Sequence, residues 1–229
     1  MVFKRKEIRV FHADKQYRYS SWIPNAVTVH SIEAADLVLF EGGSDISPTI
    51  YKEEKHRSVY PNLERDKREI EIWTEAQKLG KKCLGICRGA QLLCALSGGK
   101  LIQHMVHPNR HWIKTIDGRD FNINSTHHQM QMPFNLKKDE YKILAWAQNI
   151  STYHWLNDEV NIKNVYREPE LVFYPKTDSL CCQCHPEDLE LKEAFVDYLT
   201  HVFMQFMDNN LPSWIDNNDV SVSQQLLAL

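Results

Sequence analysis

The chain has 229 residues, of which 43% are apolar, and its 27 basic and 30 acidic residues give a formal net charge of −3. This composition indicates a globular protein and excludes a fibrous or disordered one. The balanced charge argues against a nucleic-acid or membrane-surface binder, and no apolar run approaches the roughly 18 residues of a membrane span. The N-terminus carries no secretory signal pattern, so we expect a cytoplasmic protein with six reduced cysteines.

Short apolar runs alternate along the chain with segments of helical period, which is typical of an α/β protein with a mainly parallel sheet. The helices are expected over about Leu63–Leu79, ended by Gly80, and over about Leu189–Met207, with Leu191 on its buried stripe. The charged segment Lys52–Arg68 is interpreted as a solvated loop that leads into the first helix, with a mobile lid as the alternative. The expected strands are Ile8–Phe11, Leu37–Phe40, Cys83–Ile86, Tyr141–Trp146 and Leu180–Cys184. We find no linker, and therefore expect one domain over 1–229, with 210–229 as a C-terminal tail.

The segment from Lys82 to Leu93 predicts a strand, a tight turn at Cys87 and a helix. This is the arrangement of a nucleophile elbow with cysteine in place of serine, and Gly85 and Gly89 supply the small neighbours that such a turn needs. A thiol at a helix N-terminus is favoured as thiolate by the helix dipole. For this motif alone, a buried structural cysteine is an equally good interpretation.

Two further segments supply the groups that a nucleophilic cysteine needs. The run Leu37–Asp45 is a strand that ends in paired glycines, and the backbone N–H groups of Gly43 and Arg88 could together receive an oxyanion. Near the C-terminus, a strand delivers His185, and Glu187 follows two residues later. These two residues fit the roles of a general base and of the carboxylate that orients it.

Together these residues resemble a known family. Gly85–Gln91 and Gln183–Glu187 are similar to the catalytic segments of class I glutamine amidotransferases, and three longer strings resemble the γ-glutamyl-γ-aminobutyrate hydrolase branch, the C26-type cysteine peptidases. Those strings are Glu41–Tyr51, Arg65–Glu69 and Gly98–Gln103. The segment Asn124–Gln129 resembles a loop near the active site of that branch.

The resemblance implies a three-layer, flavodoxin-like α/β domain in which Cys87 attacks a γ-glutamyl amide and forms a glutamyl thioester that water hydrolyses. It implies that His185 acts as general base and acid and that Glu187 orients it. It also implies that Gln91, Ser125 and His127 contact the substrate, although a structural role for the loop that holds His127 is an equal alternative. No cofactor and no metal is expected.

Some residues depart from the family pattern or allow another interpretation. Cys94 stands where the family usually has asparagine, His104 where it has aspartate, and Cys184 where it has an aromatic or small residue. A metal site in His104–His111 or in Cys181–His185 is disfavoured, because Pro108 interrupts the first segment and neighbouring strand residues face opposite ways in the second. The cluster of Arg65, Asp66 and Glu69 is interpreted as helix-start charges, with the pocket entrance as the alternative.

Three hypotheses for function therefore stand. The first is a stand-alone hydrolase of γ-glutamyl amides, and its partner is a small-molecule γ-glutamyl substrate. The second is a glutaminase subunit that passes ammonia to a synthetase on a partner chain. The third is a pseudoenzyme, against which the intact Cys87, His185 and Glu187 argue. The sequence leaves open whether the chain forms a homo-oligomer.

Overall fold

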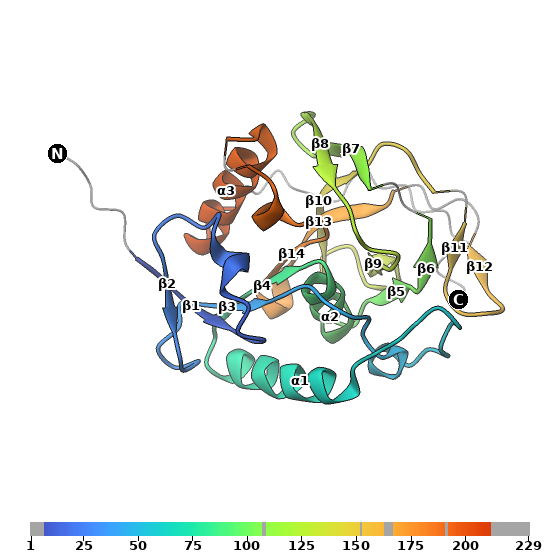
Figure 1. Cartoon of the computed structure of the whole chain (residues 1–229), viewed down its shortest axis with the longest axis horizontal. Helices are drawn as coiled ribbons and strands as arrows, with labels where there is room; N and C mark the ends of the chain where they lie inside the picture. Colours follow the sequence, from blue (N-terminus) through green and yellow to red (C-terminus); the bar gives the residue numbers. More distant parts are fainter. Residues whose placement is uncertain (1–6, 107–108, 152, 163–166, 191, 212–229) are drawn as a thin grey trace.

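The computed structural model describes residues 7–106, 109–151, 153–162, 167–190 and 192–211. The main strands are β1 (Ile8–His12), β2 (Ala26–Val29), β3 (Leu37–Phe40), β4 (Lys82–Ile86), β7 (Arg110–Thr115), β8 (Asp120–Asn124), β10 (Lys142–Ala147), β13 (Pro169–Tyr174) and β14 (Ser179–Cys182). Within the described ranges they form a nine-stranded sheet in the order β2-β1-β3-β4-β14-β13-β10-β7-β8 (Figure 1). The α/β class predicted from the sequence is confirmed.

The pairing of the strands changes from parallel to antiparallel at β14. The strands β2, β1, β3, β4 and β14 pair in parallel, whereas β13, β10, β7 and β8 continue the sheet in antiparallel pairing. The parallel part was expected from its continuous apolar runs, which are typical of strands buried on both faces. Two smaller antiparallel sheets flank this core, one of β5 (Lys100–Ile102) with β9 (Met130–Met132), the other of β6 (His104–Met105), β11 (His154–Trp155) and β12 (Asn161–Ile162).

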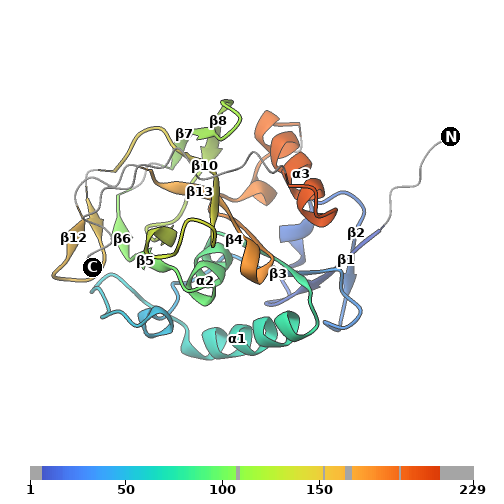
Figure 2. The ribbon, with the colours of Figure 1, turned by 180° about the vertical axis from the view of Figure 1, so that it is seen from behind.

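Helices cover both faces of the sheet and complete the three layers (Figures 1 and 2). The helices α1 (Leu63–Lys78) and α2 (Arg88–Leu96) lie on one face, and α3 (Ala194–Met207) lies on the other. A hydrophobic core lies on each face of the sheet, one beneath α3 and one beneath α2, and alternate residues of β3 point into them. Leu37 and Leu39 pack in the α3 core, and Val38 and Phe40 pack in the α2 core. Short 3-10 helices connect these elements: η1 (Tyr17–Ser20), η2 (Pro48–Tyr51), η3 (Pro133–Asn135), η4 (Pro175–Thr177) and η5 (Pro186–Asp188).

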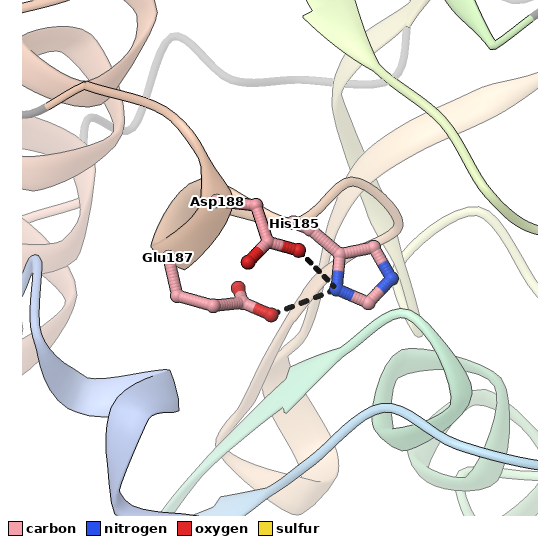
Figure 3. Close-up of side chains that lie close together, drawn as sticks. All are labelled: His185, Glu187 and Asp188. Atoms are coloured by element: carbon pink, nitrogen blue, oxygen red, sulfur yellow. Dashed lines mark hydrogen bonds and ion pairs between the residues drawn. The ribbon is translucent and has the colours of Figure 1, made fainter.

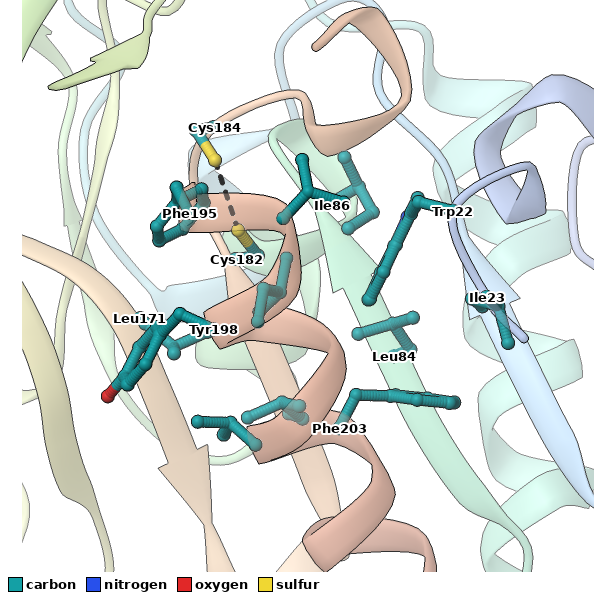
Figure 4. Close-up of a cluster of buried hydrophobic side chains, with 14 of the residues drawn as sticks. Trp22, Ile23, Leu84, Ile86, Leu171, Cys182, Cys184, Phe195, Tyr198 and Phe203 are labelled. Atoms are coloured by element: carbon teal, nitrogen blue, oxygen red, sulfur yellow. Dashed lines mark hydrogen bonds between the residues drawn. The ribbon is translucent and has the colours of Figure 1, made fainter. Parts of the chain in front are cut away.

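The α3 core is rich in aromatic side chains. Trp22 meets Phe203 edge to face, with ring centroids 5.5 Å apart (Figure 4). In the same cluster the sulfur atoms of Cys182 and Cys184 lie 3.3 Å apart without a disulfide. The residues that follow β14 are therefore held by apolar packing against α3.

The two predicted helices are present with one corrected start. The helix α1 begins after Asn62, whose side chain accepts a hydrogen bond from the Arg65 N–H at 3.1 Å, and it ends just before Gly80. The prediction that the last helix starts at Leu189 was wrong, because Pro186 opens the 3-10 turn η5 and Leu189 is extended, so that α3 starts five residues later. Leu191 and the tail beyond residue 211 lie outside the described residues.

The interpretation of Lys52–Arg68 as a solvated loop was also incomplete. Gln103, which is fully buried, accepts a hydrogen bond from the His56 N–H at 2.8 Å and donates one to the Glu54 carbonyl at 2.7 Å. His56 is itself buried. This segment is therefore fastened to the body of the protein. Among the described residues, no helix is both long and apolar enough to cross a bilayer.

Candidate active site

Cys87 occupies a strained turn between β4 and α2. Its backbone has φ 50° and ψ −107°, a conformation that non-glycine residues rarely adopt and that costs of order 1–3 kcal/mol. The helix α2 begins in close contact with β3, and this contact requires glycine at position 89. A Cβ on Gly89 would lie 1.9 Å from the Phe40 carbonyl oxygen. The strand, turn and helix predicted around Cys87 are present, with the thiol at the helix N-terminus.

His185 reaches Cys87 from the neighbouring strand. The strands β4 and β14 pair in parallel, and beyond their ends the Cys87 N–H donates to the Cys182 carbonyl at 2.8 Å. His185 Nδ1 lies 2.7 Å from Glu187 Oε1 and 4.0 Å from Asp188 Oδ2, and the other ring nitrogen points away from both carboxylates (Figure 3). His185 and Glu187 are therefore in hydrogen-bond contact, the arrangement that a base and its orienting carboxylate would need.

Burial lowers the pKa of His185, but a hydrogen bond with the Cys87 sulfur and the hydrogen bond with Glu187 outweigh it. Their combined effect raises the pKa of His185 to about 10. The imidazole is accordingly protonated at neutral pH. A protonated imidazole that lies between a cysteine sulfur and a carboxylate is the arrangement in which a cysteine can act as a nucleophile.

Two residues to which the sequence analysis assigned no individual role complete this corner. The Asn124 side chain, at the end of β8, donates to the His185 carbonyl at 2.8 Å and accepts from the His185 N–H at 3.0 Å. Tyr19 lies beside the imidazole, with ring centroids 6.0 Å apart, and burial raises its pKa to about 12. Asn124 thus fixes the His185 backbone, and Tyr19 provides a neutral hydroxyl at the site.

Other cysteines are set apart from Cys87 by their surroundings. All six cysteines are described, and all are free thiols. Burial raises the pKa of Cys83 and Cys94 to about 12 and that of Cys181 and Cys184 well above the ordinary value. These four thiols therefore serve as packed apolar groups.

The predicted oxyanion donors lie near Cys87: Gly43 lines the same cavity and Arg88 is the next residue in the chain. Gly43 lines the cavity at the end of β3 with φ +150°, and a Cβ there would lie 2.2 Å from Arg65 Nη1. Arg88 is the first residue of α2, so its N–H has no acceptor within the helix. The Arg88 side chain points elsewhere, because it is buried in ion pairs with Asp66 and Glu69.

These ion pairs form a buried network beneath the loop after β3. Arg65 donates to Glu69 Oε1 at 2.8 Å and to the Glu41 carbonyl at 3.0 Å. Asp66 accepts from Arg88 and from the Ser47 N–H at 2.9 Å, and burial raises its pKa. Arg65 and Asp66 lie in the first turn of α1, as interpreted from the sequence, but together with Glu69 they are buried and join the two segments that carry the proposed oxyanion donors.

A cavity of about 280 Å³ opens above the thiol. It is lined by Tyr19, Gly43, Asp45, Cys87, Gln91, Thr126, His127, His128, Gln129 and His185. Gln91 and His127 thus lie where a substrate would contact them, and Gln91 Nε2 already donates to the Gln129 carbonyl at 2.9 Å. Ser125 does not line the cavity; it is buried, and its N–H donates to the Asn109 carbonyl at 2.7 Å.

Possible metal ligands are dispersed. His104 lies beside His128, with Nδ1 atoms 3.4 Å apart, whereas His111 bonds Glu170 on the neighbouring part of the sheet. His107 lies outside the described residues. Within the described ranges, the one group of three close ligand atoms is His185, Glu187 and Asp188, and its first two members are hydrogen-bonded to each other.

Comparison with known proteins supports the resemblance. Residues 22–133 match the family model of Peptidase C26, a stretch that contains Cys87 but not His185. The protein NtpR of Enterococcus hirae is 32% identical over 124 residues, which are 54% of this chain and 51% of that protein. A glutamine amidotransferase-like protein of Rickettsia prowazekii is 35% identical over 96 residues, which are 41% of this chain and 34% of that protein. The chain thus spans about half or less of these two relatives.

Solved structures show the same fold. A crystal structure described as a GMP synthase subunit from Thermoplasma acidophilum superposes with a TM-score of 0.56 at 14% identity, covering 89% of this chain and 94% of that one. A glutamine amidotransferase of Thermotoga maritima superposes with a TM-score of 0.51 at 13% identity, covering 97% and 94%. The chain thus resembles Peptidase C26 and glutamine amidotransferase-like proteins over part of its length, and it shares its fold with the two solved structures.

Proposed function

We propose that the protein hydrolyses γ-glutamyl amide bonds through a covalent intermediate on Cys87. The observation that carries this proposal is the meeting of Cys87, in its strained turn, with a His185 that is held by Glu187 at 2.7 Å, both on one cavity. The substrate class follows the resemblance to Peptidase C26 and glutamine amidotransferase-like proteins.

In the first half-reaction the Cys87 sulfur attacks the amide carbonyl carbon, and the carbonyl oxygen becomes an oxyanion. The N–H groups of Gly43 and Arg88 are the proposed donors to that oxygen, and each such donor is worth about 10²- to 10³-fold in rate. His185, protonated because its pKa is about 10, gives its proton to the leaving nitrogen. The C–N bond breaks, the amine leaves, and a glutamyl thioester remains on Cys87.

In the second half-reaction water enters the place that the amine has left. His185, now neutral, takes a proton from this water as the oxygen attacks the thioester carbonyl. The C–S bond breaks, glutamate leaves, and the sulfur again faces a protonated imidazole. Glu187 holds Nδ1 throughout, so that the other ring nitrogen stays aimed at the reacting atoms.

The proposal is tested with a diazo-ketone or chloro-ketone analogue of glutamine and peptide mass spectrometry. We expect one label per chain, on Cys87, and none on Cys87→Ser. Release of glutamate from glutamine should be lost in Cys87→Ala while the melting temperature is retained. A label on another cysteine, or activity that survives in Cys87→Ala, would rule out the assignment.

A second candidate is a glutaminase subunit that hands ammonia to a synthetase on another chain. It is favoured by the fold shared with a protein described as a GMP synthase subunit, which this chain matches over 94% of that chain. The two candidates differ in one measurement. Stoichiometric labelling of Cys87 together with negligible turnover by the isolated protein would favour the second candidate, whereas turnover by the isolated protein would favour the stand-alone hydrolase.

A further inference from the structure

The charge of the cavity wall is uneven. Of the ten residues that line it, Asp45 carries a carboxylate, and none is a lysine or an arginine. Asp45 lies in the loop after β3, two residues beyond Gly43, and its side chain is 15% exposed. A substrate that enters this cavity therefore meets the Asp45 carboxylate as well as the protonated imidazole of His185 beside the Cys87 sulfur.

Hydrogen bonds hold both oxygens of this carboxylate. Oδ2 accepts from the Tyr60 N–H at 2.9 Å, and Oδ1 lies 3.1 Å from His128 Nε2. Behind His128 stand His104 and then His56, whose rings are stacked with centroids 5.2 Å apart. Burial lowers the pKa of both of these outer imidazoles, so they are neutral at neutral pH.

A carboxylate stands at each end of this row of histidines, Asp45 beside His128 and Asp158 beside His56. Asp158, at the far end, pairs with Arg57 and lies 3.5 Å from His56 Nε2. In the described part of the chain, the ion-pair contact of Asp45 is with His128 alone. A partly desolvated carboxylate with spare acceptor capacity favours a cationic ligand group.

We propose that Asp45 binds the α-ammonium group of the γ-glutamyl substrate, which makes it a specificity-determining residue of the cavity. This inference rests on the proposed function. The size of the cavity agrees with it: a volume of 280 Å³ corresponds to a width of about 8 Å, and the α-nitrogen of a glutamyl group lies about 5 Å from the reacting carbonyl carbon. One cavity can therefore hold the carbonyl at Cys87 and the ammonium group at Asp45.

The test compares glutamine with glutaric acid monoamide, which has the same amide and carboxylate but no amino group. For the unaltered protein we expect kcat/KM to be about 10- to 100-fold higher for glutamine, the worth of a hydrogen bond between charged groups. Asp45→Asn should remove most of this preference by slowing glutamine turnover while leaving the monoamide within about threefold. Asp45→Glu, which keeps the charge, should retain part of the preference.

The matched control is Asp158→Asn, which removes a carboxylate from the far end of the histidine row and should leave the preference intact. Equal kcat/KM for both substrates in the unaltered protein, or an equal loss for both in Asp45→Asn, would overturn the assignment and leave a structural role. A failure of the proposed function gives a different result from a failure of the Asp45 assignment, because the affinity label would then not modify Cys87.

Discussion

Removal of the negative charge beside His185 gives the sharpest test of the catalytic arrangement. In Glu187→Gln the side chain keeps its size but loses its charge, and Oε1 of Glu187 lies 2.7 Å from His185 Nδ1. The Glu187 side chain is fully buried, so solvent does not screen the interaction. A hydrogen bond to a charged group contributes about 1.5–3 kcal/mol, and about 1.4 kcal/mol corresponds to one pH unit of titration.

Because Glu187 raises the pKa of His185, Glu187→Gln should lower it from its value of about 10. The protonated imidazole is the proton donor to the leaving group, so activity should be lost at a lower pH than in the unaltered protein. We expect the alkaline limb of the profile of kcat/KM to move down by about one to two pH units, with a drop of about 5- to 50-fold at about pH 10 and at most about twofold at pH 8.

The interaction of Cys87 with His185 can also be followed without a substrate, as the rate of Cys87 alkylation by iodoacetamide against pH, which reports the thiolate. The matched control is Asp188→Asn, since Asp188 lies 4.0 Å from the same nitrogen, is half exposed and pairs with Arg18. It should leave both profiles within a few tenths of a pH unit. An unchanged alkaline limb in Glu187→Gln, or an equal shift in Asp188→Asn, would refute the orienting role of Glu187.

Three further predictions concern stability. Glu69→Gln leaves the buried guanidinium groups of Arg65 and Arg88 without a charged partner and should lower the free energy of unfolding in urea by about 3–5 kcal/mol. The control Glu75→Gln, in an exposed pair on the same helix, should lower it by less than about 1 kcal/mol. Similar losses in both variants would contradict the importance of the network. Gly89→Ala should fail to fold or should have a much lower melting temperature, because its Cβ would collide with the Phe40 carbonyl. The control Gly80→Asn, in open space with φ +59°, should keep the melting temperature. A stable Gly89→Ala would contradict the close approach of α2 to β3. Burial raises the pKa of Cys83 and Cys94 to about 12, so an unfolded thiol titrates first. The contribution of these two thiols to the unfolding free energy should be constant below about pH 9 and then fall, by about 1.4 kcal/mol per pH unit for each thiol, up to about pH 12. Cys94→Ala should flatten that fall, and a profile unaffected by this change would show that the thiol is not the cause.

The parallel strands could be predicted because each one is a short apolar run buried on both faces. The strand Leu37–Phe40 has the predicted bounds, and all four of its residues are buried. The antiparallel strands β7 and β8 were missed: in β7 buried and exposed residues alternate along Arg110–Thr115, and Arg110, Trp112 and Lys114 occupy the exposed positions. Such strands are defined by their partners, which a local pattern does not reveal.

The site shows the same division between local and distant information. Cys87 and Gly89 could be identified because the turn and its steric demand lie within a few residues of sequence. Asn124 could not, since its amide meets His185 across 61 positions of the chain. The role of Glu69 was also hidden, because i, i+4 charges on a helix normally face solvent and only the packing of α1 buries this one.

The pairing of β4 with β14 has a consequence for how the protein becomes reactive. The strands that carry Cys87 and His185 are neighbours in the sheet but are separated by almost a hundred residues of chain. During synthesis the segment with the cysteine emerges well before its base, and only the closure of this long loop brings them together. The thiol should therefore be alkylated slowly on a nascent chain that stops before β14, and quickly only once the last strand has been inserted.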